Sequence, residues 1–532
     1  MYDAVILGGG LAGLTLARQL HRESPHLRVL VAEKTPHPVR EAAHKVGESS
    51  VEIGAHYFQS VLGLEPHLRT RQLEKLGLRY FFPYAGNRDI IRRVELGPPQ
   101  FPVVPSFQLD RGRFENALFD DLVAAGVEVL DGCKVRRVGL NEGGPRHHVV
   151  DIECPGGVRT VEARFVADAS GRAGLIRRQL GLTKAVTHGA NASWFRVSTR
   201  IAVDDWSTDK AWRERVPTGE RWLSTTHLMG RGYWVWLIPL GSGSMSVGIV
   251  ADDDLHPYSR INRYERALEW LHEFEPQCAA VVEQLRDKVE DFLALKHYAY
   301  GCSRVFSPDN WTLVGEAGLF TDPFYSPGSD FIAIGNDCTV DLIQRTARGE
   351  DVSARAESFN ETYLRLYDAF IRLYDGQYRL MGNAQVMTAK AAWDNAAYWA
   401  ITAQLYFQRR FRDPAFIASI GPLFRRFTVL HARMQQFFRA WDLADDSTYA
   451  DQAANVVELD YLWDLQRSLA DGPLSDDALR ERLERNFALL ERFASAWQKC
   501  ALGAVPNLPT FVADAPPLDI TPLTFAPVPA PA

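Results

Sequence analysis

Two hydrophobic patterns alternate over the first part of the chain. Residues 3–7 form a short, mainly apolar run that predicts a buried strand. Residues 11–21 carry apolar side chains at helical spacing, and residues 28–32 form a second apolar run that ends at Glu33. A strand, a helix and a strand of these lengths predict a βαβ unit with parallel strands.

Strand patterns continue as far as about residue 300. Helical spacing at 112–125 precedes a strand pattern at 127–130, and residues 135–166 alternate like a β-meander. Residues 190–300 hold more strand candidates, including 233–239. The first part of the chain therefore predicts a mixture of parallel and antiparallel sheet.

The pattern changes to helices after about residue 335. Long stretches at helical spacing cover residues 354–381, 384–412, 415–441 and 474–500. Residues 503–532 are rich in Pro and Ala and carry little charge. We expect a helical C-terminal region and a tail without regular structure, extended against the body or in solvent.

A glycine-rich turn follows the first predicted strand and opens the first predicted helix. Residues 8–13 fit G-x-G-x-x-G, and Glu33 stands 20 residues beyond Gly13. Such glycines let the backbone approach a pyrophosphate, and a carboxylate at this spacing binds a ribose. The pattern predicts a dinucleotide, FAD or NAD, and disfavours NADP. The candidate residues in the turn are Gly8, Gly10, Leu11, Ala12 and Gly13.

Composition narrows the class of protein. A chain of 532 residues exceeds what one core usually serves, so we expect two or three domains. The net charge of −7 argues against a nucleic-acid partner. No run reaches the roughly 20 apolar residues that span a bilayer, and the first residues do not resemble a signal peptide. These features predict a cytoplasmic protein without a membrane partner.

The six cysteines are scattered and form no C-x-x-C pair. This distribution predicts free, buried thiols in a reducing compartment, and neither disulfides nor a metal site.

Two later segments favour FAD. Asp168 begins a D-A-S-G-R segment that resembles the second cofactor-binding segment of the glutathione-reductase-like FAD proteins. Gly315 and Glu316 resemble the third, where an acid, usually Asp, holds the ribityl chain. Arg111 lies in a stretch that resembles the one approaching the flavin pyrophosphate, although a surface Arg at a helix start is an alternative.

Three further motifs resemble those of the flavin-dependent, tryptophan-halogenase-like halogenases, and their order along the chain is that of the family. Residues 234–239 match W-x-W-x-I-P, whose two Trp, here Trp234 and Trp236, crowd the flavin face in that family. Residues 320–328 match F-x-x-P-x-x-S-x-G, the flavin and halide loop of the family. Its candidates are Pro323, Phe324, Tyr325, Ser326, Pro327 and Gly328. Residues 46–49 match V-G-E-S beside the isoalloxazine, with Val46, Gly47, Glu48 and Ser49.

Residues 75–81 resemble the family's K-x-G-x-x-F segment. The resemblance therefore implies that Lys75 is the catalytic lysine at the far end of a tunnel from the flavin. Lys45 competes for the role but stands next to V-G-E-S, closer to the flavin side.

The resemblance covers about residues 1–345 and implies an α/β fold. We expect an FAD-binding, Rossmann-like domain of the glutathione-reductase type at 1–185 and 300–345, with substrate-side insertions around 50–105. A β-sheet substrate domain would occupy 186–299. The helical C-terminal region would occupy 346–502, followed by the Pro/Ala-rich tail at 503–532.

The implied activity is halogenation of an electron-rich aromatic by hypohalous acid that Lys75 guides. A flavin reductase would supply reduced FAD, and bromide or chloride would be the halide. Tyr325 replaces the loop Glu of tryptophan halogenases, which points to a phenol, a pyrrole or a carrier-bound aryl group rather than free tryptophan. Pro327 removes one backbone N–H from the halide loop, so weak halide binding is expected.

Two other functions stay open. One is an aromatic hydroxylase of the same FAD fold, which needs no tunnel lysine. The other is a flavin-binding protein without halogenating turnover. The oligomeric state is also open, with a homodimer as one possibility.

Overall fold

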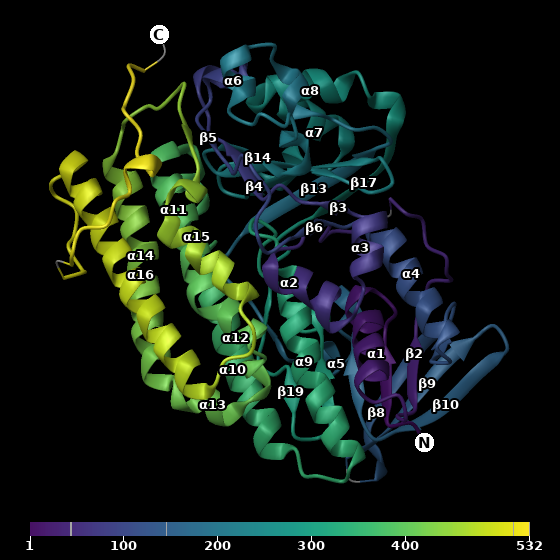
Figure 1. Ribbon diagram of the computed structural model, residues 1–532. Coiled ribbons are helices and arrows are strands. Elements are labelled where there is room, and N and C mark those ends of the chain that lie inside the picture. Colours follow the sequence, from purple (N-terminus) through teal and green to yellow (C-terminus); the bar gives the residue numbers. More distant parts are fainter. Residues whose placement is uncertain (43–44, 145, 514, 531–532) are drawn as a thin grey trace.

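The structure is a computed structural model that describes residues 1–42, 45–144, 146–513 and 515–530 (Figure 1). The first βαβ unit forms as its pattern predicts and lies inside what we call the N-terminal sheet. The strands of this sheet are β1 (Ala4–Leu7), β2 (Val29–Ala32), β7 (Glu128–Leu130), β11 (Val166–Asp168), β19 (Phe306–Ser307) and β20 (Trp311–Leu313).

These strands lie in the order β19-β20-β11-β1-β2-β7, and all pairs are parallel except β19 with β20. Helix α1 (Leu11–Glu23) packs on β1 and β2, and α4 (Arg111–Ala124) packs on β7. Helix α1 also contacts both α4 and α9 (Gly328–Ala347). The continuous apolar strands are buried on both faces, as is usual in a parallel sheet. The expected α/β fold with a parallel, Rossmann-like sheet is thereby confirmed.

A second sheet, the central sheet, is mostly antiparallel. Its strands are β4 (Leu78–Phe81), β5 (Glu95–Leu96), β13 (Ala190–Val197), β14 (Thr225–Gly230), β15 (Tyr233–Pro239), β16 (Met245–Asp252), β17 (Val289–Leu295) and β21 (Ala453–Ala454). They lie in the order β17-β13-β16-β15-β14-β4-β5-β21. Strands β4 and β5 come from the expected insertion and β21 from the helical region, so one sheet joins three parts of the sequence.

Alternation along β15 separates two environments. Trp234 and Trp236 face the large core shared with the N-terminal sheet, whereas Val235 and Leu237 face a second core. Helices α7 (Tyr264–Phe274) and α8 (Pro276–Glu283) enclose that second core. The stretch between residues 190 and 300 thus contains helices as well as the expected strands. These helices cover the outer apolar face of the central sheet.

A β-meander follows β7, with strands β8 (Lys134–Gly144), β9 (His147–Cys154) and β10 (Gly157–Ala163). Its register pairs Lys134 with Glu153, which brings the flanking Cys133 and Cys154 together. These two cysteines form a disulfide. The expectation of free thiols throughout was therefore wrong for this pair, because the turn of a hairpin, not a C-x-x-C spacing, makes them neighbours. Cys278, Cys302, Cys338 and Cys500 are free.

The C-terminal region is helical and stands beside the two sheets, green to yellow in Figure 1. Its helices are α10 (Ser353–Ile371), α11 (Ala384–Ala397), α12 (Gln404–Phe407), α13 (Pro414–Ser419), α14 (Gly421–Ala444), α15 (Asp460–Arg467) and α16 (Asp476–Ala504). The pattern at 384–412 is divided by a π-helical segment at Tyr398–Ala403. The pattern at 415–441 is divided where Gly421 and Pro422 start a new helix.

The tail lies against the body. The amide of Gln385 on α11 donates to the carbonyl of Leu523 and accepts from the N–H of Phe525, and both tail side chains are buried. Residues 514, 531 and 532 of the predicted tail lie outside the described part. Across the described chain, we find no helix whose length and apolar character would let it cross a bilayer.

The remaining short elements connect these layers. They are α2 (Glu52–His56), α3 (Glu65–Arg71), α5 (Leu175–Gln179), α6 (Lys210–Glu214), β3 (Leu73–Glu74), β6 (Phe107–Gln108), β12 (Thr183–Lys184) and β18 (Gly301–Cys302).

Candidate functional site

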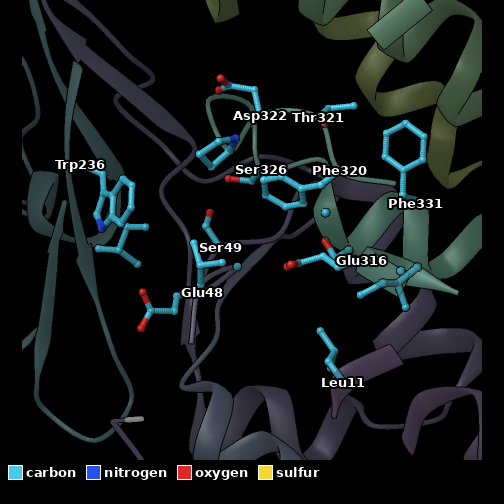
Figure 2. A pocket seen from close by; sticks show the side chains of 18 of the residues that line it. Leu11, Glu48, Ser49, Trp236, Glu316, Phe320, Thr321, Asp322, Ser326 and Phe331 are labelled. Atoms are coloured by element: carbon cyan, nitrogen blue, oxygen red, sulfur yellow. The ribbon is translucent and has the colours of Figure 1, made fainter. Parts of the chain in front are cut away.

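A cavity lies between the N-terminal and central sheets. Figure 2 shows Trp236 on one wall, Leu11 and Glu316 on the opposite wall, and Glu48 and Ser49 between them. The cavity therefore brings together segments that the sequence places hundreds of residues apart. Predicted residues that line it are Leu11, Val46, Gly47, Glu48, Ser49, Arg111, Trp234, Trp236, Gly315, Glu316, Pro323, Ser326 and Gly328.

The glycine turn is built for close backbone packing and for an open helix end. A Cβ at Gly8 would lie 2.4 Å from the carbonyl oxygen of Ala169, and one at Gly13 would lie 1.9 Å from that of Gly8. A Cβ at Gly10 would meet nothing within 4 Å. Gly10 caps α1 without a side-chain hydrogen bond, and no acid stands in the first turn. The free N-terminus fits a pyrophosphate.

Glu33 lies at the end of β2 beside this turn. Its Oε2 accepts from the N–H of Gly9 at 2.7 Å, and its Oε1 accepts from the N–H of Thr35 at 2.8 Å. These bonds fix the carboxylate where a ribose would follow the pyrophosphate. The residues present thus fit the adenosine half of a dinucleotide.

Asp168 does not face the cavity. It is buried, and its carboxylate accepts from the N–H groups of Ser170 at 3.0 Å and Ile176 at 2.7 Å. These hydrogen bonds hold the segment that follows β11. The glycine turn packs against Ala169 in that segment.

Arg111 lines the cavity beside the V-G-E-S segment. Its guanidinium donates to the carbonyl of Val46 at 2.5 Å and to Oε1 of Glu115 at 2.7 Å. Burial lowers the pKa of Arg111 to about 10. Glu115 also pairs with Lys45, so the two cations share one buried carboxylate. Arg111 thus contributes a cation to the cavity wall, and a guanidinium there suits a neighbouring pyrophosphate.

Glu48 is held by a buried ion-pair network that the sequence does not reveal. Oε1 of Glu48 accepts from Nε of Arg196 at 2.8 Å, and Arg196 also pairs with Asp291 at 2.7 Å. Arg196 lies on β13, so the central sheet fixes the position of the V-G-E-S segment.

The two Trp of β15 form an aromatic wall. Their ring centroids are 5.7 Å apart, and Trp234 also packs against Phe324 at 5.2 Å. Nε1 of Trp236 donates to Ser246, and Nε1 of Trp234 donates to the hydroxyl of Tyr378 at 3.0 Å. Both rings are thereby fixed in orientation.

Asp322 joins this wall to the helical region. Its Oδ2 accepts from the hydroxyls of Tyr298 at 2.5 Å and Tyr378 at 2.7 Å, and it lies 2.6 Å from Nε2 of His188. The motifs did not point to His188 or Tyr378, because only the fold brings them to Asp322.

The loop at 320–328 ends at α9. Ser326 has a left-handed φ of 58°, and Pro327 precedes the first helical residue, Gly328. Ser329 lines the cavity, is 7% exposed, and its Oγ has no hydrogen-bond partner among the described residues. The first N–H groups of a helix also lack intrahelical acceptors. Sequence reasoning overlooked Ser329, which adds a hydroxyl donor beside the proline.

Lys75 is fully buried behind the cavity wall. Its Nζ donates to Oγ of Ser49 at 2.8 Å and to the carbonyl of Ser50 at 2.9 Å. Because Ser49 lines the cavity, one side chain separates the amine from the cavity. Burial lowers the pKa of Lys75 to about 7, against the opposing effect of the Glu52 and Asp330 carboxylates.

Asp330 and Glu52 are buried acids near this lysine. Asp330 accepts from the N–H of Gly54 and from the hydroxyl of Tyr398, both at 2.8 Å, and burial raises its pKa to about 8. Glu52 accepts from Nε1 of Trp399 at 2.9 Å. The amine thus lies in a dry, acid-flanked site.

Comparison with known proteins gives the family. Residues 83–386 match the family described as tryptophan halogenase, and residues 6–73 match an NAD(P)-binding Rossmann-like domain. The flavin-dependent halogenase chlA of Dictyostelium discoideum is 27% identical over 445 residues, or 78% of this chain and 72% of the relative. A 1H-pyrrole-2-carbonyl-[peptidyl-carrier protein] chlorinase of Pseudomonas fluorescens is 27% identical over 62% of this chain and 72% of its own length.

Solved structures share the fold. Halogenase PltM, in complex with phloroglucinol and FAD, has a TM-score of 0.64 at 15% identity, covering 92% of this chain and 96% of that one. CmlS, a flavin-dependent halogenase, has a TM-score of 0.54 at 23% identity, covering 73% and 64%. The resemblance inferred from the motifs is confirmed: the chain belongs to the tryptophan halogenase family of flavin-dependent halogenases.

Proposed function

We propose that this protein halogenates an electron-rich aromatic ring by means of hypohalous acid and Lys75. The observation that carries the proposal is the buried Lys75 amine, which is bound to Ser49 at the wall of the cavity. A buried lysine with a lowered pKa is costly for a fold and suits a chemical role.

FAD would be held by the turn at Gly8–Gly13, with Glu33 at the ribose. Arg111 and Glu316 would line its flavin half. When bound and reduced, FAD supplies the activation of oxygen and the oxidation of halide. A separate flavin reductase would provide the reduced cofactor. The Trp234–Trp236 wall and the buried Glu48 keep water away from this part of the cavity.

Lys75 would control the released hypohalous acid. Its neutral amine can take the halogen to form an N–halogen bond while water leaves, and the ring then takes the halogen from nitrogen and returns its proton to the amine. Its protonated form can instead donate a hydrogen bond to the acid. The pKa of about 7 populates both forms near neutral pH.

Phenols, pyrroles and carrier-bound aryl groups are the candidate rings, and the carrier-bound pyrrole named for one relative supports the last two. Tyr325 stands where tryptophan halogenases have Glu, which argues against free tryptophan.

The mass of the product tests this function. Protein, FAD, a flavin reductase, NADH and bromide or chloride are incubated with a panel of phenols and indoles. We expect a product with a halogen isotope pattern. A gain of one oxygen atom would instead identify an aromatic hydroxylase, and flavin binding without any new product would identify a protein without halogenating turnover.

The halide site yields a separate prediction. Pro327 offers no N–H, so we expect weak halide binding and preferred use of bromide, which is more easily oxidised. The hydroxyl of Ser329 would replace one donor. Ser329→Ala should therefore raise the KM for both halides by about tenfold, as for one lost hydrogen bond to a charged group.

Steady-state halogenation at varied bromide and chloride measures both effects, and FAD affinity serves as the control. Equal use of both halides at low concentration would contradict the argument from the missing donor. An unchanged halide KM in Ser329→Ala would exclude the hydroxyl.

A further inference from the structure

A second polar cluster lies where the loop at 320–328 meets α11. We call it the hydroxyl cluster, and it consists of Tyr80, Tyr325, Tyr374, Lys390 and Asp394. All five side chains are buried. They come from β4, the loop, the connection after α10, and α11, so that only the folded chain assembles them.

Asp394 is fully engaged within the protein. Its Oδ2 accepts from the hydroxyl of Tyr325 at 2.8 Å and from Nζ of Lys390 at 2.7 Å. Its Oδ1 accepts from Nε2 of Gln435 at 2.8 Å. The carboxylate is therefore neutralised and anchored, and the Tyr325 hydroxyl is already committed as its donor.

The other two tyrosine hydroxyls have no such partner. Tyr80 is 2% exposed and Tyr374 is 0% exposed, and neither hydroxyl makes a hydrogen bond within the described residues. Buried polar groups are nearly always paired, so these two hydroxyls are available to donate to a ligand. Burial raises the pKa of both phenols well above its usual range, and both remain O–H donors.

Ring contacts place these two tyrosines around the same loop. Tyr80 lies 5.7 Å from Phe324, and Tyr374 lies 6.1 Å from Tyr325, between ring centroids. Tyr80 also stacks on His227 at 4.7 Å, and His227 is paired with it across β14 and β4. His227 lines the flavin cavity. The two free hydroxyls thus flank the loop on the side of the helical region.

The cluster is also close to Lys75 along the chain. Lys75 stands five residues before Tyr80, at the entry to β4, and Thr225 at the start of β14 bonds to the same Ser49 hydroxyl as the lysine amine. Lys75 and Tyr80 are therefore linked by a short stretch of chain and by the pairing of β4 with β14.

We propose that the hydroxyls of Tyr80 and Tyr374 bind the oxygen of a phenol and so hold its ring for halogenation. This inference rests on the proposed function and narrows its substrate class to phenols. A phenolic oxygen can accept from both hydroxyls at once, whereas the single ring N–H of an indole or a pyrrole can donate to only one hydroxyl oxygen and leaves the other without a partner.

Two donated hydrogen bonds would also favour the reaction. They stabilise negative charge on the phenolic oxygen, which makes the ortho and para carbons more electron-rich. Both hydroxyls are shielded from water, so the ring reaches them only when side chains move apart. Tyr374 lies in the connection between α10 and the 3₁₀ turn at Tyr378–Gly382, outside regular helix.

The test compares Tyr80→Phe and Tyr374→Phe with a matched control, Tyr367→Phe. The Tyr367 hydroxyl is also buried without a hydrogen-bond partner in the described chain, but it lies on α10 beside Gly301. Each substitution removes only an oxygen. Calorimetric titration of the FAD-loaded protein with a simple phenol and with an indole measures binding without turnover.

We expect each of the two variants to weaken phenol binding by about tenfold and at most one of them to weaken indole binding, with FAD affinity and the Tm unchanged. Equal weakening of phenol and indole binding in both variants, no weakening of phenol binding, or the same loss in Tyr367→Phe would each overturn the subsite. Because binding is measured without halide or oxygen, a failure of halogenation would count against the proposed function and leave this result standing.

Discussion

Lys75→Met is expected to bind FAD and consume oxygen with reduced flavin normally, while halogenated product falls at least about a hundredfold, or about 2.7 kcal/mol of transition-state stabilisation. Methionine keeps the apolar stem but removes the amine. The fold should tolerate the change, because the lost group is a buried amine whose pKa is already lowered to about 7. Single-turnover assays that follow both flavin oxidation and product separate the two steps.

Lys45→Met is the matched control. Lys45 pairs with Glu115 on the flavin side and does not contact Ser49 in the described structure. We expect it to keep halogenation. If Lys75→Met halogenated at near the wild-type rate and Lys45→Met did not, the roles of the two lysines would be exchanged.

The pH dependence tells which form of Lys75 acts. With a pKa of about 7, the neutral fraction rises roughly tenfold between pH 6 and pH 8. If the neutral amine captures the halogen, product per reduced flavin rises with pH over this window, and Lys75→Met removes that rise. A fall over the same window would assign the work to the protonated amine.

Gly10→Asp should abolish FAD binding, with at least a hundredfold loss of affinity. Gly10 has φ of −84°, which any residue adopts, and a Cβ there meets open space. The new carboxylate would stand at the free N-terminus of α1 and repel a pyrophosphate. Flavin fluorescence titration measures the loss, and circular dichroism checks the fold.

Gly10→Ala is the control, since it adds the Cβ without the charge and should retain most of the affinity. Gly13 is unsuitable for this test, because its Cβ would press on the carbonyl of Gly8 and disturb the turn itself. Wild-type affinity in Gly10→Asp would show that the cofactor lies elsewhere.

The sequence predicts those parts of the molecule whose signal is local. The turn at 8–13 needs only its neighbouring strand and helix, and the alternation in 233–239 correctly separates two Trp from Val235 and Leu237. The order of the motifs along the chain identified the family. In these cases one short segment contains all the residues that determine the local structure.

The remaining site depends on partners that are remote in sequence. Arg196 reaches Glu48 across 148 positions, and Tyr378 reaches Asp322 across 56. No spacing rule foresees such pairs, because the register of β13 and the position of the helical region decide them. The Cys133–Cys154 disulfide was not predicted from the sequence for the same reason, since it depends on the register of one hairpin.

The Tyr378 hydroxyl has a consequence for protein engineering. This one oxygen accepts from the indole of Trp234 and donates to Asp322, so a helical-region residue completes the cavity wall. A chimera that took its C-terminal half from a relative would replace Tyr378, which holds Trp234 of the cavity wall, together with Tyr374 and Lys390 of the hydroxyl cluster. The two halves of this protein are therefore not interchangeable modules, and the cavity wall and the hydroxyl cluster must be redesigned together.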